Sequence, residues 1–151
     1  ITPADIINQS KLLLGIRECR IEFLSPCIIE DGGNRRDSID FSRLIKAIIE
    51  RLQPNIGFWC DHMIRNKDRD AAVASLIARA SEVESDFSLD EWVHETSHKY
   101  NRKSGSLSGF KGSLDVRGDL DLFWPFLLLG SVVHVGLRSN LDRGRYRLIL
   151  R

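Results

Sequence analysis

The sequence predicts a single α+β domain built on an antiparallel sheet. Two periodic patterns of hydrophobic residues indicate this class. Apolar and polar residues alternate in segments near both ends of the chain, and apolar residues recur at helical spacing in one segment between them. Of the 151 residues, 42% are hydrophobic, which is enough for the core of one domain of ordinary size.

The first convincing strand covers residues 18–24. Its apolar residues alternate with charged ones, as in a strand that is buried on one face: Cys19, Ile21 and Phe23. We expect residues 1–17 to form a linker or a short helix ended by Gly15, and residues 18–151 to form the domain. After the strand, Pro26 should interrupt the pairing, and the segment EDGGNRRD should form a turn.

The clearest helix covers residues 41–52. One apolar face follows the spacing of an α-helix: Phe41, Leu44, Ile45, Ile48, Ile49 and Leu52. Ser38 or Asp40 is expected to cap this helix, and Pro54 to end it. A second helix is expected over residues 68–83, and because it is weakly apolar it should lie on the outside of the domain.

From Phe87 onward the hydrophobic period changes to two, which predicts a β-hairpin. The two strands are EWVHETSHK and GSLSGFKGSLDVRGD, and a long basic tip, SHKYNRKSG, connects them. A short apolar helix, LFWPFLLLG, should follow and lie at the centre of the domain. Asp119 or Asp121 is expected to cap it, and Gly130 to end it.

The last segment of the chain reads as a strand, a loop rich in arginine and a final strand. The first of these strands is expected at residues 132–135, and the second at residues 146–150. Without the weakly apolar helix, the order of elements is βαββαβ, which defines a ferredoxin-like fold with one additional helix. Its helices cover one face of the sheet, and RNA-recognition domains bind single strands on the opposite, open face.

Charge is distributed unevenly, although the formal net charge is only +1. Residues 98–117 hold five Lys or Arg against one acid, and residues 136–151 hold five Arg against one acid. Such clusters can bind a polyanion, and they are also compatible with a solvated surface. The hairpin tip and the terminal loop need not lie at the same edge of the sheet, so an RNA that touches both is expected to cross the domain.

Three segments resemble the C-terminal domain of the CRISPR repeat-processing endoribonucleases of the RAMP superfamily. They are CRIEFLSPCII, DFSRLIKAIIERL and GFKGSLDVRGDLDLFWPFLLLGSVVHVGLRSNLDRGRY. The resemblance runs from about Glu18 to Arg151 and implies a ferredoxin-like fold. It implies RNA binding by this domain and, in the intact protein, metal-independent cleavage of precursor crRNA through attack of the 2′-hydroxyl. The implied setting is antiviral defence in the cytoplasm, with CRISPR repeat RNA and CRISPR effector subunits as partners and no cofactor.

Members of this family carry a glycine-rich loop just before the final strand. Its four glycine positions hold His134, Gly136, Asp142 and Gly144 in this sequence, so two glycines remain. Asp142 places a negative charge where a phosphate would approach, and the neighbouring arginines can compensate for it.

The candidate site residues come from the two basic clusters. Glycine lets backbone N–H groups approach an anion, arginine adds bidentate contacts to phosphate, and tyrosine offers a face for stacking. The predicted RNA-binding residues are Lys99, Tyr100, Arg102, Lys103, Lys111, Gly136, Arg138, Arg143, Gly144 and Arg145. His98 is the candidate catalytic residue, because it adjoins the first cluster and histidine suits acid–base chemistry near neutral pH. His134 lies between two valines of a predicted strand and is interpreted as structural.

Two other functions remain open. One is a non-catalytic RAMP subunit that holds crRNA in an effector complex, and the other is a ferredoxin-like domain that binds proteins.

No residues have the spacing of metal ligands, and no apolar stretch is long enough for a membrane span. The three widely spaced cysteines predict free thiols in a reducing cytosol.

Overall fold

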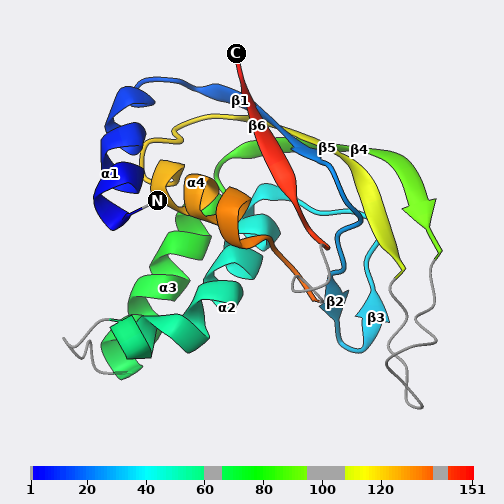
Figure 1. The fold of residues 1–151 in the computed structure, drawn as a ribbon, viewed down its shortest axis with the longest axis horizontal. Helices are drawn as coiled ribbons and strands as arrows, with labels where there is room; N and C mark the ends of the chain where they lie inside the picture. The colour runs from blue at the N-terminus through cyan, green and yellow to red at the C-terminus, as the bar shows by residue number, and fades with distance from the viewer. Residues whose placement is uncertain (1, 60–65, 95–107, 138–142) are drawn as a thin grey trace.

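The computed structural model describes residues 2–59, 66–94, 108–137 and 143–151 (Figure 1). These ranges contain helices and strands in the following order: α1 Pro3–Leu12, β1 Glu18–Phe23, β2 Glu30–Asp31, β3 Asn34–Arg35, α2 Phe41–Trp59, α3 Asn66–Ala80, β4 Glu84–Val93, β5 Gly109–Arg117, α4 Trp124–Val133 and β6 Tyr146–Leu150.

Four of the strands form one antiparallel sheet in the order β4-β5-β1-β6. Strand β1 is central, and Ile21 pairs with Leu114 of β5 on one side and with Leu148 of β6 on the other. Together with α2 and α4, these strands give the βαββαβ order and the strand arrangement of a ferredoxin-like fold. The predicted fold class is therefore confirmed.

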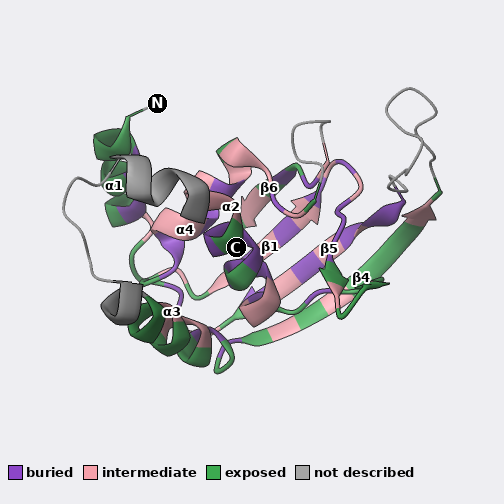
Figure 2. Cartoon of the chain, turned by 90° about the horizontal axis from the view of Figure 1, so that it is seen from below, coloured by how far each residue is buried: buried purple, intermediate pink, exposed green. Residues whose placement is uncertain are grey.

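The helices lie on one face of the sheet, which arches over them in Figure 1. Helices α2 and α4 pack against each other, while α1 packs on α4 and α3 packs on α2. The core lies between this helical layer and the sheet, where Figure 2 shows the buried segments. Its fully buried side chains include Ile21 of β1, Ile45 of α2, Leu114 of β5 and Trp124 of α4. Among the described residues, no helix combines the length and the apolar character needed to cross a membrane.

Helix α1 forms because its first turn is capped by its own side chains. The Thr2 hydroxyl accepts a hydrogen bond from the Asp5 N–H, and the Asp5 carboxylate accepts one from the Thr2 N–H. Gly15 follows the helix with a φ of +87°, as expected for a residue that ends it. Its N–H donates to Asp121 at 2.9 Å, so Asp121 anchors the end of α1. The placement of the domain boundary at residue 18 stays a prediction.

The ends of α2 and α4 differ from the predictions. Helix α2 continues through Pro54 to Trp59, so the predicted end at Pro54 is wrong; a proline removes one backbone donor and does not always end a helix. Helix α4 begins after Phe123 without a side-chain cap, so the predicted cap by Asp119 or Asp121 is wrong.

The prediction that Gly130 ends α4 is also wrong, and so is the strand predicted at residues 132–135. The helix runs through Gly130 to Val133, where the predicted strand should have begun. A Cβ at position 130 would lie 2.9 Å from the Ile48 side chain and would also overlap the Tyr146 hydroxyl. Gly130 is therefore needed for the close approach of α4 to α2 and β6, and it does not stop the helix.

A short hairpin completes the fold. The segment EDGGNRRD forms the β2–β3 hairpin, and Gly32 and Gly33 occupy its turn with φ angles of +60° and +81°. The predicted turn is confirmed. Strand β4 begins at Glu84, earlier than the change of period at Phe87 indicates.

Candidate nucleic-acid interface

The segment Ser25–Ile29 joins the bases of the two loops that were predicted to bind RNA. On one side, the backbone of Cys27 exchanges two hydrogen bonds with Phe110, at 2.7 and 3.1 Å, where the β4–β5 hairpin begins its return strand. On the other side, the Gly144 N–H donates to the Pro26 carbonyl at 2.9 Å, and the Leu137 N–H donates to the Ile28 carbonyl at 2.9 Å.

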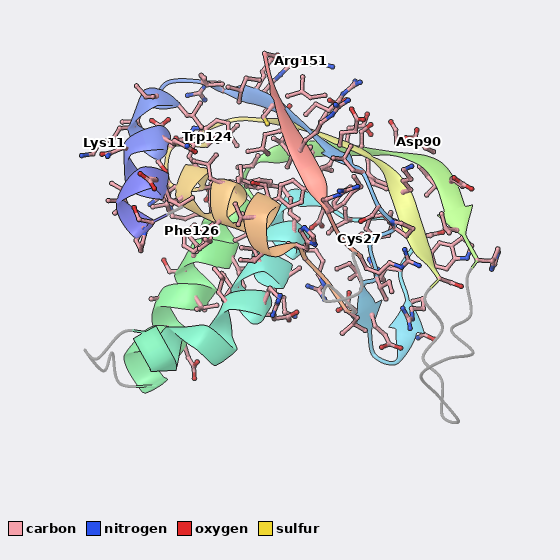
Figure 3. The ribbon with its side chains drawn as sticks, viewed as in Figure 1. Lys11, Cys27, Asp90, Trp124, Phe126 and Arg151 are labelled. Carbon is pink, nitrogen blue, oxygen red and sulfur yellow. The ribbon has the colours of Figure 1, made fainter. Side chains whose placement is uncertain are left out.

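Both loops therefore leave the sheet at the same end, where β1 finishes. The antiparallel order requires this, because β1 runs toward the end at which β5 and β6 start. An RNA does not have to cross the sheet to approach both loop bases, contrary to the expectation. Figure 3 shows Cys27 near this end and Arg151 at the far end of β6.

The two glycines of the terminal loop allow its backbone to pack tightly. Gly136 and Gly144 have φ angles of +85° and +75°, which favour glycine. A Cβ on Gly144 would overlap the backbone of Val135, and a Cβ on Gly136 would approach the Ile28 carbonyl too closely. The Gly144 N–H is bonded to the Pro26 carbonyl. Both glycines therefore have a structural reason to be present, and their predicted contact with RNA stays a prediction.

The structure places three more of the predicted positions as follows. Lys111 lies in β5 on the open face of the sheet, where it pairs across the strands with Glu91. Arg143 is half-buried and Arg145 is exposed, and the Arg145 N–H donates to the Ser25 hydroxyl at 3.0 Å. The other predicted site residues lie outside the described parts of the chain: His98, Lys99, Tyr100, Arg102, Lys103 and Arg138.

The open face of the sheet carries ion pairs. Arg20 makes a bidentate contact with Asp115, at 2.8 and 3.1 Å, and Arg147 makes another with Glu22, at 3.0 and 3.1 Å. Arg117 lies 2.9 Å from Glu18. These pairs neutralise much of the charge that an RNA strand would meet on this face.

The aromatic side chains of the sheet lie on its opposite, helix-covered face. Their ring contacts and cross-strand pairs connect them to one another: Phe23, Phe87, Trp92, Phe110 and Tyr146. Stacking of bases needs an exposed aromatic surface. The described strands therefore offer no aromatic surface for stacking on the open face, and RNA binding on that face stays a prediction.

The ion pairs and burial shift several pKa values. The hydrogen bond from Arg20 lowers the pKa of the Asp115 carboxyl, and the hydrogen bond from Arg43 lowers that of Asp31. Burial raises the pKa of the Cys19 thiol to about 11 and raises that of Cys27 further. Both are free thiols, as predicted, and neither is poised for chemistry. In the described ranges, no three His, Cys, Asp or Glu side chains are grouped so that they could hold a metal ion.

Sequence reasoning overlooked the β2–β3 hairpin as part of this end of the sheet. Arg35 donates to the Ser108 carbonyl at 3.3 Å, which ties the hairpin to the residues just before β5. The Arg36 side chain is 53% exposed and lies 3.9 Å from Asp31. The signal in the sequence was the pair of arginines that follows the Gly-Gly turn after Asn34.

His134 does not lie in the strand that was predicted around it. It lies just beyond α4 as the C-terminal cap, with φ and ψ of 64° and 160°. Among the described residues, His134 is the one non-glycine residue with a positive φ. Its side chain is only partly buried, and its interpretation as a structural residue stays a prediction.

The fold is that of a ferredoxin-like α+β domain, and its candidate site lies at the end of the sheet where β1 finishes. The family model described as CRISPR-associated endoribonuclease Cas6 matches residues 21–146, and the chain belongs to this family. The predicted family is therefore confirmed. A comparison of the sequence with curated proteins finds no match.

Solved Cas6 structures share this fold. A Cas6 product complex aligns with a TM-score of 0.59 at 14% identity, covering 99% of this chain and 56% of that chain. A Cas6 from Thermus thermophilus aligns with a TM-score of 0.58 at 13% identity, covering 99% of this chain and 58% of that chain. A chain of a Cas6-RT-Cas1–Cas2 complex aligns with a TM-score of 0.60 at 16% identity, covering 99% of this chain and 16% of that chain. The chain thus spans little more than half the length of the first two.

Proposed function

We propose that this chain is the RNA-binding C-terminal domain of an endoribonuclease that processes precursor crRNA. One observation carries the proposal: the chain aligns over 99% of its own length with Cas6 chains of which it covers 56% and 58%. It therefore corresponds to one part of such a protein, and one of these relatives is described as a product complex.

The end of the sheet where β1 finishes is the proposed RNA-binding surface. It joins the terminal loop and the β4–β5 hairpin through the segment Ser25–Ile29, and Arg143, Arg145 and Arg36 lie on or beside these loops. Arginine suits this role because its guanidinium matches the geometry of a phosphate group. The neutralised open face is not part of the proposed surface.

In the intact protein, we propose cleavage by attack of the 2′-hydroxyl on the adjacent phosphate. This reaction needs a base near the 2′-oxygen, an acid near the 5′-oxygen, and cations on the phosphorane. The described residues of this chain supply cations and no pair of acid–base groups beside them. His98 remains the candidate that this chain offers, and the other groups are assigned to the rest of the intact protein.

The proposed partners are CRISPR repeat RNA and other CRISPR proteins. The match to a Cas6-RT-Cas1–Cas2 complex supports the second class. A non-catalytic subunit that retains crRNA is the second candidate function, and the absence of an acid–base pair among the described residues favours it over a self-sufficient nuclease.

Binding of a fluorescent repeat RNA across a series of salt concentrations tests the proposal. Each phosphate contact with a single strand contributes a slope of about −0.7 in log K against log salt. Changing Lys99, Arg102 and Lys103 to alanine should weaken binding and flatten the slope by about two units. Arg79→Ala removes a positive charge from the outer helix α3, away from the proposed surface. It should change neither the RNA affinity nor the salt slope.

The terminal loop is tested in the same assay. Changing Arg138 and Arg143 to alanine should flatten the slope by about one unit. Asp142→Gly should strengthen binding because it removes a like charge. If the wild-type chain binds RNA no better than the variants and shows the same slope, the arginines are solvated surface and the domain belongs to the protein-binding class.

Cleavage separates the two RNA-binding functions. Residues 1–151 alone, incubated with labelled repeat RNA and EDTA, should not cleave above background. Specific cleavage that is lost in His98→Ala would show that this chain carries its own catalytic histidine.

A further inference from the structure

Helix α4 is apolar on every side, although the domain buries only one of its sides. Its ten residues include no charged side chain. Its one hydroxyl group, on Ser131, donates a hydrogen bond to the Leu128 carbonyl of the same helix at 2.6 Å. A helix that is hydrophobic all round is normally buried all round. The apolar character of α4 therefore exceeds what the core of this domain requires.

The outer side of α4 carries an apolar stripe. Trp124, Leu127 and Gly130 face the core and are buried. Helical spacing places four apolar residues on the opposite side, one of them in the turn before the helix. We call them the α4 stripe: Leu122, Pro125, Leu129 and Val132. Leu122 and Val132, at the two ends of the stripe, are 41% and 47% exposed, and the two residues between them are half-buried.

Helix α1 widens this apolar surface at the start of α4. The two helices pack against each other (Figure 1), and the Gly15 N–H donates to Asp121, the residue before Leu122, at 2.9 Å. Leu12 and Leu14, which precede this glycine, are exposed. Contiguous exposed apolar surface of this kind typically marks a site of protein contact.

The two ends of the α4 stripe carry opposite charges. Asp119 and Asp121 lie just before the helix and are exposed. At the other end, Arg51 of α2 lies with its Nε 3.4 Å from the Val133 carbonyl. A twofold axis through the middle of the stripe would therefore bring the acidic end of one copy to the arginine end of another. The surface is complementary to itself in charge as well as in apolar character.

From this pattern we propose that the α4 stripe is a twofold-symmetric interface with a second copy of this chain, in which the two α4 helices pack antiparallel. Such an interface uses the same patch on both copies, so each apolar side chain meets apolar surface and no like charges are placed opposite each other. The proposal does not rest on the proposed RNA-binding function.

Sedimentation velocity of residues 1–151 over a series of protein concentrations tests the proposal. The wild-type chain should show a reversible equilibrium between monomer and dimer. Val132→Glu should raise the dissociation constant of the dimer by about a hundredfold, because the symmetry buries two unpaired charges. Leu89→Glu is the matched control, since Leu89 lies on β4 and is 48% exposed. It introduces the same charge and should leave the dissociation constant unchanged.

A charge exchange tests the antiparallel arrangement. Asp119→Arg alone and Arg51→Glu alone should each weaken the dimer by about tenfold, because like charges then meet at both ends of the interface. The double variant should recover the wild-type dissociation constant, because the pairs form again with reversed sign.

A wild-type chain that stays monomeric at every concentration overturns the proposal. An equal loss of dimer in Leu89→Glu and Val132→Glu also overturns it, because the association would then involve another surface. If the double variant is weaker than both single variants, the antiparallel pairing is wrong. Circular dichroism shows that each variant is folded, and RNA is absent throughout, so these results are independent of RNA binding.

Discussion

Replacing Gly130 with alanine should destabilise this domain, although the same change usually stabilises a helix. Position 130 lies inside α4 and is buried, and its Cβ would lie 2.9 Å from the Ile48 side chain and overlap the Tyr146 hydroxyl. Ile48 is 0% exposed, and Tyr146 is held by a 2.6 Å hydrogen bond from its hydroxyl to the Leu127 carbonyl. Neither neighbour can move away freely.

The sign follows from comparing two magnitudes. Alanine gains up to about 1 kcal/mol over glycine inside a helix. Overpacking a buried site costs about 1–3 kcal/mol. We therefore expect a net loss of about 1–2 kcal/mol in the free energy of unfolding, measured by urea denaturation at constant m-value.

A double-mutant cycle provides the control. Tyr146→Phe alone removes the hydrogen bond to Leu127 and should cost about 1 kcal/mol. In the double variant with Gly130→Ala, the overlap with the hydroxyl disappears, so the total loss should be smaller than the sum of the single losses. If Gly130→Ala is as stable as the wild type or more stable, the close approach of α4 to α2 and β6 does not limit this position, and our reasoning is wrong.

Three further predictions concern charge, thiols and the terminal loop. The hydrogen bond from Arg20 lowers the folded-state pKa of Asp115, so this pair should stabilise the protein above about pH 4 and stop doing so as the pH falls through the lowered pKa. The difference between the urea midpoints of the wild type and Asp115→Asn should therefore be smaller at pH 3 than at pH 6. Cys19 and Cys27 should resist alkylation in the native protein at pH 8 and react after unfolding, as followed by peptide mass spectrometry, because burial raises both pKa values. Gly144→Ala should lower Tm by several degrees, since its φ is +75° and a Cβ would overlap Val135; an unchanged Tm would show that the loop base can rearrange.

Features that depend on neighbours in the sequence were predicted well. The alternation of Cys19, Ile21 and Phe23 gave β1 its buried face, and the apolar face beginning at Phe41 gave α2 its start. Gly32 and Gly33 marked their turn because a positive φ is cheap for glycine. The order of these elements was enough to predict the sheet, whereas the family was predicted from the resemblance of three segments.

The errors occurred where the meaning of a residue depends on distant contacts. Gly130 looked like the end of a helix, and its true role comes from Ile48 and Tyr146, which are far away in the sequence. Pro54 looked like a stop, although α2 continues beyond it. The register also showed that the aromatic residues of the sheet share its core side, which leaves charged side chains on the open face.

The candidate site shows the same division between sequence and tertiary structure. Composition alone identified the two basic clusters, because charge density is a property of the sequence. Only the tertiary structure brought their loop bases together, through backbone hydrogen bonds from Cys27 to Phe110 and from Gly144 to Pro26. It also gave His134 its unusual φ, since that angle is fixed by the closure of α4 and by the bond between Val135 and Gly144. Hydrophobic periodicity determines which segments form helices and strands, whereas hydrogen bonds between distant segments decide which side chains meet at a site.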